Sequence, residues 1–331
     1  MSAPLRGVNL GGWLVLEKWM TPSLFDATDA VDEYTFMSTP DAAARLQSHR
    51  ETFITESDMA WIAEQGLDLV RLPVGHWVLG GDEPYLGAAG LLDAAMDWAA
   101  TYELAVLLDL HAASGSQNGQ DHSGRVGPRR WYRERSHREH THAALAALAT
   151  RYANHPALWG LELVNEPMDW RIWRLRHFHA DAYRRLAAQL APGTHVVFSD
   201  AFVPWIQRGS LAGSATLPTV IDSHFYQAFY PWDVFRTIDS HIAKARRRGR
   251  LVSWLSRLQP VVIGEWSGGL PARAYRGRSA EERPALTKAY LDAQLEGYAD
   301  ALAWCFWSYR TETADDWNFR HLVESGLLKL S

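Results

Sequence analysis

Apolar residues follow two different periodicities along this chain, and the two alternate from end to end. In segments such as 91–102 and 175–190 they recur three or four positions apart, which is the spacing of an amphipathic helix. Between such segments lie eight short β-type runs, at residues 5–9, 67–74, 104–110, 158–164, 195–199, 219–226, 261–265 and 301–307. Strand patterns that alternate with helical patterns favour a parallel sheet. We therefore predict an α/β fold, a single (β/α)₈ barrel domain that spans residues 1–331.

Local signals at the helix ends support this order of elements. Thr55 stands three residues before Asp58, and Ser279 stands three residues before Glu282. Both pairs have the form of a capping box, in which two side chains satisfy free backbone N–H groups at the start of a helix. Gly66 is expected to end the first of these helices just before the second strand.

Polar side chains gather where the predicted strands end. In a (β/α)₈ barrel the catalytic residues come from the C-terminal ends of the strands, which all open on one face. The residues at those ends are Asn9, Arg71, His111, Asn165, Glu166, Asp200, His224, Tyr226, Glu265 and Trp307. This set is too polar for a structural face, so we predict an active site there.

Two of these residues, Glu166 and Glu265, each follow a buried apolar run. Strands four and seven of an eight-stranded barrel lie on roughly opposite sides of its mouth, so the two carboxylates should face each other. Retaining glycoside hydrolysis uses such a pair about 5 to 5.5 Å apart, one as acid and base and the other as nucleophile. We expect Glu265 to be held ionised and Glu166 to have a raised pKa in a drier environment. The alternative is a structural network in which the glutamates pair with Arg71.

The neighbouring residues suit the same chemistry. Asn165 can donate to a sugar hydroxyl beside the reacting carbon, and Trp307 can form the floor of a pocket. His111 and His224 could ligate a metal, but no third ligand stands at a suggestive spacing, so hydrogen bonds to a glutamate or to sugar are favoured. The histidine-rich run 137–142 lacks the zincin spacing and is interpreted as a solvated helix start. We therefore predict neither a metal nor an organic cofactor.

Composition narrows the function classes. The chain has 331 residues and a net charge of −5, which gives no support for nucleic acid or an anionic membrane as a partner. No apolar run approaches the roughly 20 residues of a membrane span, and the sequence predicts no oligomeric state. The single cysteine, Cys305, excludes an intramolecular disulfide and lies in an apolar run typical of a core position. With no visible signal peptide a cytoplasmic location is expected, or a secreted one if a signal has been removed.

Two further features point toward carbohydrate. The chain contains 16 tryptophans, and several stand beside polar residues at strand ends, where flat aromatic faces suit sugar rings. The loop at 112–136 is long, polar and without apolar period, and loops of this length in compact domains are usually functional or disordered. We expect its segment 115–124 to line one rim of the cleft.

Short motifs occur along nearly the whole chain, at 6–13 (RGVNLGGW), 71–75 (RLPVG), 109–111 (DLH), 115–119 (GSQNG), 165–167 (NEP), 224–227 (HFYQ), 264–266 (GEW) and 306–308 (FWS). Together they resemble glycoside hydrolase family 5, and within it the fungal exo-β-1,3-glucanases. The resemblance implies that Glu166 is the acid/base and Glu265 the nucleophile. It also implies that Glu17 and Asp121 close the pocket around the non-reducing end of the substrate, which makes such enzymes exo-acting. The residues that it implies around the reacting sugar are Arg71, His111, Asn165, His224, Tyr226 and Trp307.

The chain departs from these relatives on the leaving-group side. Where the fungal enzymes carry an aromatic residue in the rim loop this chain has Gln120, whereas Phe229 matches the other half of their aromatic clamp. We predict a retaining exo-acting β-glucosidase or exo-β-1,3-glucanase that acts on a β-glucoside or β-glucan oligosaccharide. The alternatives are a family 5 glycosidase for another β-glycoside, such as a β-1,6-glucan or a small-molecule or lipid glucoside, and a non-catalytic sugar-binding barrel.

Overall fold

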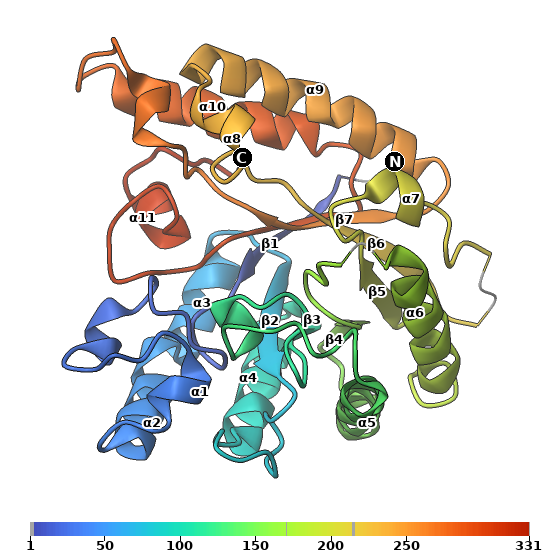
Figure 1. The fold of residues 1–331 in the computed structure, drawn as a ribbon. Helices are drawn as coiled ribbons and strands as arrows, with labels where there is room; N and C mark the ends of the chain where they lie inside the picture. The colour runs from blue at the N-terminus through green and yellow to red at the C-terminus, as the bar shows by residue number, and fades with distance from the viewer. Residues whose placement is uncertain (1–2, 170, 214–215, 331) are drawn as a thin grey trace.

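The computed structural model describes residues 3–169, 171–213 and 216–330. Its eight strands are parallel and form a closed barrel in which each strand pairs with the next and the last pairs with the first (Figure 1). The strands are β1 (Leu5–Asn9), β2 (Leu69–Gly75), β3 (Ala105–Ala112), β4 (Leu158–Glu162), β5 (His195–Ser199), β6 (Thr219–His224), β7 (Val261–Trp266) and β8 (Ala303–Phe306). The predicted (β/α)₈ barrel is confirmed.

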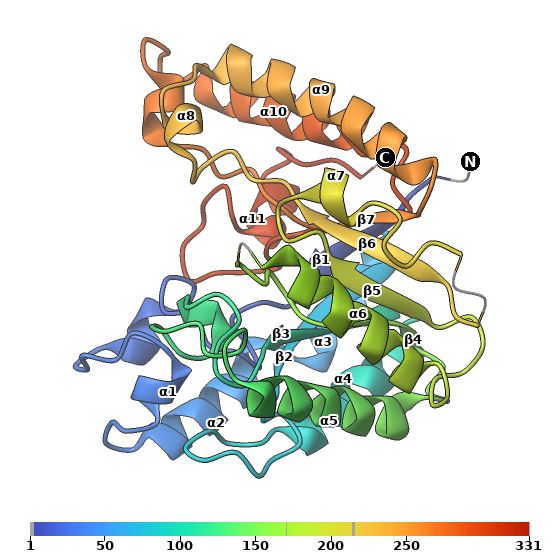
Figure 2. The same ribbon diagram turned by 45° about the vertical axis from the view of Figure 1, so that its right-hand side comes forward.

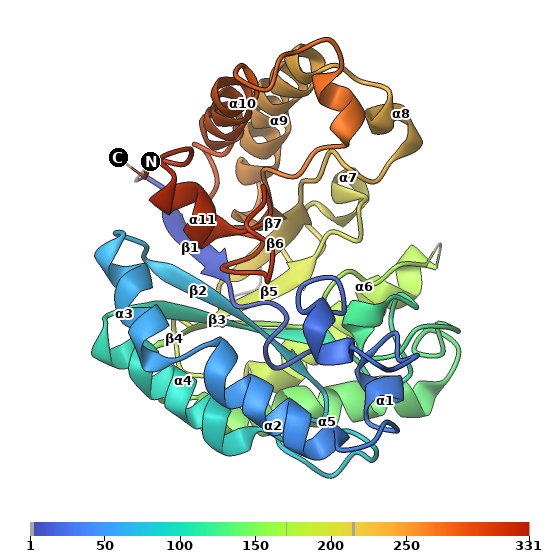
Figure 3. The same cartoon turned by 90° about the vertical axis from the view of Figure 1, so that its left-hand side faces the viewer.

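Helices cover the outside of the barrel (Figure 3). The longer ones are α2 (Ala42–Phe53), α3 (Glu56–Glu64), α4 (Ala89–Thr101), α5 (Arg135–Tyr152), α6 (Ile172–Leu186), α9 (Ile238–Ser256) and α10 (Arg283–Gly297). The short ones are α1 (Glu33–Phe36), α7 (Pro204–Gln207), α8 (Pro231–Val234) and α11 (Phe319–Glu324). Helices α9 and α10 lie side by side on one side of the barrel (Figure 2). Within the described ranges, no helix combines the length and apolar character needed to cross a bilayer.

The interior of the barrel is layered. Alternate residues of a strand share one face, so an apolar residue deep in a strand is followed two positions later by another inward-facing side chain. The deep layer is apolar, and its buried members are Leu69, Leu107, Val197, Val220, Val262, Ala303 and Cys305. The next inward-facing layer is charged. Its buried members are Arg71 on β2, Asp109 on β3, Glu162 on β4 and Asp222 on β6. A charged layer therefore lies between the packed floor and the mouth. The core position predicted for Cys305 is confirmed.

Several predicted strands end earlier in the structure than the apolar runs suggested. The bounds of β1 and β5 match the predicted ones, but β4 and β6 end at Glu162 and His224, and β8 ends at Phe306. The pairing register also shifts near the ends of β6, β7 and β8. At these points the chain leaves the sheet for the loops above the barrel. The residues just beyond the strands therefore aim their side chains over the mouth.

Both predicted capping boxes are present. The backbone N–H of Thr55 donates to Asp58 Oδ2 at 2.8 Å at the start of α3, and the N–H of Ser279 donates to Glu282 Oε2 at 2.8 Å just ahead of α10. Gly66 follows α3 with a φ of 74°, a conformation that costs glycine little. The first signal therefore placed the start of α3, whereas α10 begins at Arg283 with Glu282 as its N-cap, so the second box forms the turn just before that helix.

Candidate active site

A cavity of about 610 Å³ opens at the mouth of the barrel. It is lined by Glu17, Trp19, Gln120, Asp121, His122, Glu166, Met168, Phe202, His224, Tyr226, Phe229, Tyr230, Glu265, Trp307 and Trp317. Eight of the eleven residues predicted to act on or bind the substrate are among them. The other three, Arg71, His111 and Asn165, are fully buried and contact lining residues from behind. The structure thus brings these eleven residues together, whereas Asn9 and Asp200, also predicted at strand ends, are buried and are not among the lining residues.

Glu166 lies in the loop that follows β4 and has an unusual backbone conformation. Its φ is 40°, in the left-handed region that residues with a side chain rarely adopt. Hydrogen bonds on both sides hold it there: the N–H of Asn165 donates to the Leu110 carbonyl at 3.1 Å, and Asn118 Nδ2 donates to the Glu166 carbonyl at 3.2 Å. Such strain persists only where the surroundings over-determine it, and it clusters at functional sites.

Arg71 forms the centre of the charged layer below the pocket. Its Nε donates to Glu162 at 2.9 Å, its Nη1 to Glu265 at 3.1 Å and its Nη2 lies 3.0 Å from Asp109. A fourth carboxylate, Asp222, lies 3.7 Å away. Burial opposes the charge, but these carboxylates outweigh it and raise the pKa of Arg71 further above its ordinary value. Removal of one partner from a buried ion pair costs about 3 to 5 kcal/mol, so this cluster must be kept intact.

The same arginine orients Asn165 and, through Asp109, also His111. Arg71 Nη2 donates to Asn165 Oδ1 at 2.9 Å, which leaves the amide NH₂ of Asn165 directed toward His111 Nε2 at 3.4 Å. His111 Nδ1 donates to Asp109 Oδ2 at 2.6 Å, and burial lowers the pKa of His111 to about 4. His111 is therefore a neutral imidazole whose ring is stacked on Trp307, with centroids 5.3 Å apart.

Glu265, on β7, is held by donors on each of its oxygens. Arg71 Nη1 donates to Oε1 at 3.1 Å, and the hydroxyl of Tyr226 donates to Oε2 at 2.7 Å. An arginine and a hydroxyl therefore both stand beside this carboxylate. A carboxylate fixed at both oxygens has little freedom to rotate, which is what a group that must attack in one direction requires.

His224 connects the two glutamates. Its Nδ1 donates to Glu166 Oε1 at 2.7 Å and lies 3.4 Å from Glu265 Oε2, while its Nε2 donates to Asp222 at 3.0 Å. One carboxylate oxygen of Glu166, one ring nitrogen of His224 and one carboxylate oxygen of Glu265 lie within 4.8 Å of one another. The prediction that the two carboxylates face each other is confirmed. The same atoms could surround a cation, but an imidazole that carries a proton on both nitrogens has no lone pair for a metal.

The predicted protonation states of the two glutamates were wrong. Burial raises the pKa of Glu166, but the hydrogen bond and charge of His224 outweigh it and lower that pKa to about 2. Burial and the charge of Glu166 raise the pKa of Glu265 to about 7, against the opposing effects of His224 and Arg71. His224 itself is held charged, because the carboxylates of Glu265 and Asp222 outweigh burial and raise its pKa well above the ordinary value. The sequence did not reveal that an imidazolium sits on Glu166.

Glu17 and Asp121 approach each other at another part of the pocket wall. Burial, and then the charge of Asp121, raise the pKa of Glu17 well above its ordinary value. Glu17 Oε2 accepts a hydrogen bond from Trp19 Nε1 at 2.8 Å, but its buried Oε1 has no partner. A buried oxygen without a partner is costly, so Glu17 is held at this wall against a desolvation penalty.

Aromatic side chains form another wall, which the sequence revealed only in part. The ring of Phe229 lies 5.3 Å from that of Tyr226 and 5.8 Å from that of Trp317, which in turn lies 5.6 Å from Trp19. Phe229 and Gln120, the two predicted clamp positions, both line this cavity. The segment 115–124, predicted to line one rim, contributes Gln120, Asp121 and His122 to the cavity. Residues that sequence reasoning did not single out are Trp19, Met168, Phe202, Tyr230 and Trp317.

Some of these missed residues had a local signal. Gly269 follows β7, and a Cβ there would collide with the ring of Trp317, so this glycine permits the close approach of the loop after β8. Asp200 lies two residues before Phe202, and its Oδ1 accepts a hydrogen bond from the Phe202 N–H at 2.7 Å. This bond stabilises a turn in which Phe202 has a φ of 61°. Met168 and Tyr230 lie in irregular loops with no such signal.

A closed barrel with two facing carboxylates in a pocket at its strand ends is the arrangement of a glycoside hydrolase. The comparison with protein families agrees, since the model described as cellulase (glycosyl hydrolase family 5) matches residues 33–312. The chain belongs to glycoside hydrolase family 5 and is a glycosidase.

Several known proteins are similar to this chain. The chain is 37% identical to a protein from Aspergillus niger named probable glucan 1,3-beta-glucosidase A, with 100% of this chain and 88% of that one covered. It is 34% identical to the glucan 1,3-beta-glucosidase of Blumeria graminis, with 98% and 86% covered. Among solved structures, the rutinosidase from Aspergillus niger has a TM-score of 0.84 at 20% identity, with 98% of each chain covered. Endoglucanase Cel5A from Thermotoga maritima has a TM-score of 0.61 at 16% identity, with 97% and 96% covered. At these identities the two structures establish the fold alone.

The hydroxyl of Tyr226 should measurably lower the pKa of Glu265. It donates to the ionised carboxylate, so Tyr226→Phe removes a contact that favours the charged form and raises that pKa further above about 7. The measurement is a ¹³C NMR titration of the glutamate carboxyl carbons in the two proteins. Tyr230→Phe, which removes a hydroxyl from the same pocket, is the matched control and should leave the titration of Glu265 in place. An unchanged pKa in Tyr226→Phe would contradict the electrostatic description.

Proposed function

We propose that this protein is a retaining, exo-acting β-glucosidase that releases terminal β-linked glucose from β-1,3-glucan oligosaccharides. The observation that carries this proposal is the pair Glu166 and Glu265, which have carboxylate oxygens within 4.8 Å of each other in one pocket. That separation suits a nucleophile and an acid/base, because an inverting pair must leave room for a water at about 6.5 to 9.5 Å. The names of the relatives from Aspergillus niger and Blumeria graminis support a β-1,3-glucan as substrate.

In the proposed reaction Glu265 is the nucleophile. One of its oxygens forms a bond to the anomeric carbon as the bond from that carbon to the leaving oxygen breaks, and Glu166 supplies a proton to that oxygen. Glu166, now ionised, accepts a proton from a water that attacks the same carbon and releases Glu265. Arg71 and Tyr226 fix the direction of attack, and the amide NH₂ of Asn165 is available to a sugar hydroxyl once substrate displaces weaker contacts.

The proton for the leaving oxygen is stored on His224 in the free enzyme. The hydrogen bond of 2.7 Å between its Nδ1 and Glu166 joins an imidazolium to a carboxylate. An uncharged sugar that fills the pocket excludes water. Without water, the ionised pair of Glu166 carboxylate and His224 imidazolium is less favourable than the neutral pair of Glu166 carboxylic acid and His224 imidazole. Substrate binding therefore favours transfer of this proton to Glu166. The low pKa of Glu166 in the free enzyme is compatible with its role as an acid for this reason.

Exo action requires a subsite that is closed beyond the terminal sugar, and this proposal assigns the closure to Glu17 and Asp121. Both residues line the same cavity as the two glutamates, and Glu17 is only 5% exposed. Their carboxyl groups suit the hydroxyls of a terminal sugar. In this proposal the non-reducing end therefore binds at Glu17 and Asp121, and the leaving group lies toward Phe229.

A second candidate, a glycosidase for another β-glucoside, is favoured by one observation. Gln120 and Phe229, the two expected clamp positions, both line the cavity, and only Phe229 offers a ring on which a glucan unit could stack. Phe202, Tyr230 and Met168 add apolar surface to the same cavity. Such a surface also suits an apolar leaving group, as in a small-molecule or lipid glucoside.

The retaining mechanism is tested by the first product. With a β-glucoside as substrate, proton NMR in the first minutes should show β-glucose before mutarotation produces the α-anomer, because two displacements restore the original configuration. In Glu265→Ala turnover should be lost, and azide should rescue it by direct attack that gives the α-glucosyl azide.

Glu166→Ala provides the matched comparison. It should lose about 10² to 10⁴-fold on substrates with poor leaving groups and be rescued by azide to the β-glucosyl azide, because the nucleophile is intact. Initial α-glucose from the wild type, or the opposite azide products from the two variants, would contradict the assigned roles.

The pH profile of kcat/KM should report the same groups. Protonation of Glu265 removes the nucleophile, so activity should fall as the pH drops through about 7. Loss of the proton held on His224 removes the acid, so activity should also fall at a pH well above the ordinary pKa of histidine. Asp222→Asn removes a carboxylate that raises the pKa of His224, and it should move the basic limb to lower pH. A basic limb that stays in place would contradict the storage of the proton on His224.

The leaving-group side is tested by two variants, one that removes an aromatic ring and one that adds a ring. Phe229→Ala should raise KM several-fold for laminari-oligosaccharides but little for an aryl glucoside with a small leaving group. Gln120→Phe should lower KM for the same oligosaccharides, because it adds a second ring at the entrance.

If wild type hydrolyses lipid or flavonoid glucosides at least tenfold better than laminaritriose, the second candidate replaces the first. Failure to hydrolyse any activated aryl glycoside would instead support a non-catalytic sugar-binding barrel.

A further inference from the structure

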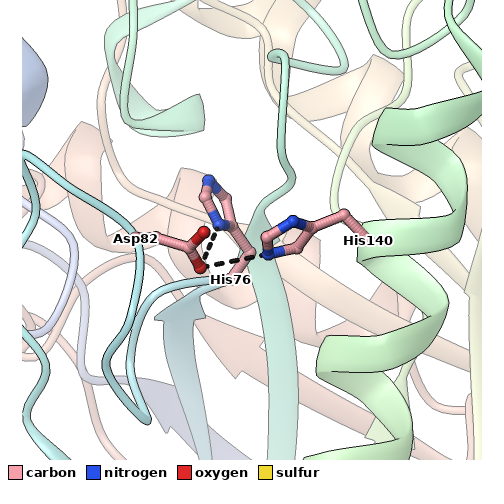
Figure 4. A group of neighbouring side chains, drawn as sticks. All are labelled: His76, Asp82 and His140. Carbon is pink, nitrogen blue, oxygen red and sulfur yellow. Dashed lines mark hydrogen bonds and ion pairs between the residues drawn. The ribbon is translucent and has the colours of Figure 1, made fainter.

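In the described part of the chain, side chains with metal-ligating atoms converge in three groups of three. Two of the groups share His224 and belong to the pocket already described. The third consists of His76, Asp82 and His140, none of which lines that pocket (Figure 4). His76 Nδ1 lies 3.1 Å from Asp82 Oδ2, and His140 Nε2 lies 3.0 Å from the same oxygen. Three side chains from three segments thus direct one donor atom each toward a common point.

The first ligand, His76, is fixed by its surroundings. It directly follows β2, and its backbone N–H donates to the Ala112 carbonyl at 2.9 Å. Its ring packs edge-on against Trp77 and Tyr85, at centroid distances of 5.0 and 5.6 Å. Those two rings are themselves stacked 3.8 Å apart. The imidazole therefore has little rotational freedom to lose on binding a ligand, which favours affinity.

The other two ligands come from a loop and from a helix. Asp82 follows Gly80 and Gly81, whose φ values of 95° and 92° let the chain turn sharply and bring the carboxylate back toward His76. His140 lies on α5, and its ring centroid is 5.1 Å from that of His76. The α5 segment lies beside the loop in the fold although 58 residues separate Asp82 from His140. A ligand bound here would join the two segments.

Two of the three separations between ligand atoms are close to those around a small divalent cation. With Zn–N and Zn–O bonds of about 2.0 to 2.2 Å, tetrahedral ligand atoms lie about 3.3 to 3.5 Å apart. The two nitrogen-to-oxygen separations of 3.0 and 3.1 Å need to increase by only a few tenths of an ångström, and all three ligand atoms lie within 4.8 Å of one another. Two imidazole nitrogens and one carboxylate oxygen also form a donor set typical of zinc.

We propose that His76, Asp82 and His140 form a binding site for Zn²⁺ or a similar first-row divalent cation, separate from the catalytic pocket. Water completes the coordination on the side of His140, whose side chain is 40% exposed. The ion ties the segment 76–82 to the first turns of α5. One turn earlier on α5, His137 Nδ1 shares a hydrogen bond of 2.9 Å with Ser114 Oγ at the start of the rim loop. The site therefore stabilises the support of that loop and takes no part in the reaction.

The predicted solvated helix start at 137–142 is therefore only partly solvated, since His140 Nε2 lies 3.0 Å from Asp82 Oδ2.

The test is calorimetric titration of the metal-stripped full-length protein with ZnCl₂, together with thermal unfolding. Wild type should bind one Zn²⁺ at this site and show a melting temperature that rises by several degrees, since a ligand that binds only the folded state stabilises it. His140→Ala should lose this binding event and the thermal shift while its glucosidase activity stays unchanged. His76→Asn provides a second variant that removes a different ligand.

Two controls separate this site from others. His155 pairs with Asp97 at 3.3 Å and belongs to none of the three groups in the described residues, so His155→Ala should bind Zn²⁺ as wild type does. Glu265→Gln removes a donor from the catalytic pocket and should likewise leave this binding event intact. The proposal is overturned if wild type binds no Zn²⁺, or if the His140 and His76 variants bind it as well as wild type. Neither outcome bears on the proposed glycosidase activity.

Discussion

The buried guanidinium of Arg71 is the interaction on which the rest of the site depends. It lies between the apolar floor of the barrel and the open pocket, and its donors reach Glu162, Asp109, Glu265 and Asn165. Burial of one cation is costly unless it is paired, and burial of several carboxylates is costly unless a cation lies among them. Each therefore requires the other. The pairing fixes Glu265 directly and fixes His111 through Asp109, so the geometry of the mouth is set by the contacts of Arg71 one layer below it.

The two carboxylates of the pocket are made different by their partners. Glu265 is bound by Arg71 and Tyr226 yet has a pKa raised to about 7, whereas Glu166 contacts His224 and has a pKa lowered to about 2. Since His224 is bound on its far side by Asp222, the imidazolium is stabilised from two directions. In the proposed mechanism this arrangement keeps one proton beside the two glutamates, and the bound sugar determines which group carries it.

The sequence predicted the fold and most of the pocket because both follow from simple patterns. Apolar runs between helical segments identified the strands, and the rule that barrel chemistry lies at strand ends identified Glu166, Glu265 and their neighbours. The charged layer was not predicted, because Asp109, Glu162 and Asp222 stand inside apolar runs. The inward direction of Asp109 and Asp222 follows from their position two residues before His111 and His224 on the same strands. That relation becomes useful only once the strand ends are known.

Other features could not be predicted because they depend on contacts between distant loops. The protonation states were reversed because the sequence does not reveal which glutamate His224 contacts. Trp19 and Trp317 meet across the pocket wall from opposite ends of the chain, and His140 meets Asp82 through the packing of α5 beside a loop.

The central claim is that Glu265 forms a covalent bond to glucose, and the most direct measurement is mass spectrometry of the trapped intermediate. A 2-deoxy-2-fluoro-β-glucoside with an activated leaving group slows the second displacement, so the glycosyl-enzyme should accumulate. Digestion of the inactivated protein should then give one peptide that carries the added sugar mass on Glu265. A label on Glu166 instead, or turnover of ordinary glucosides by a protein that never becomes labelled, would contradict the account.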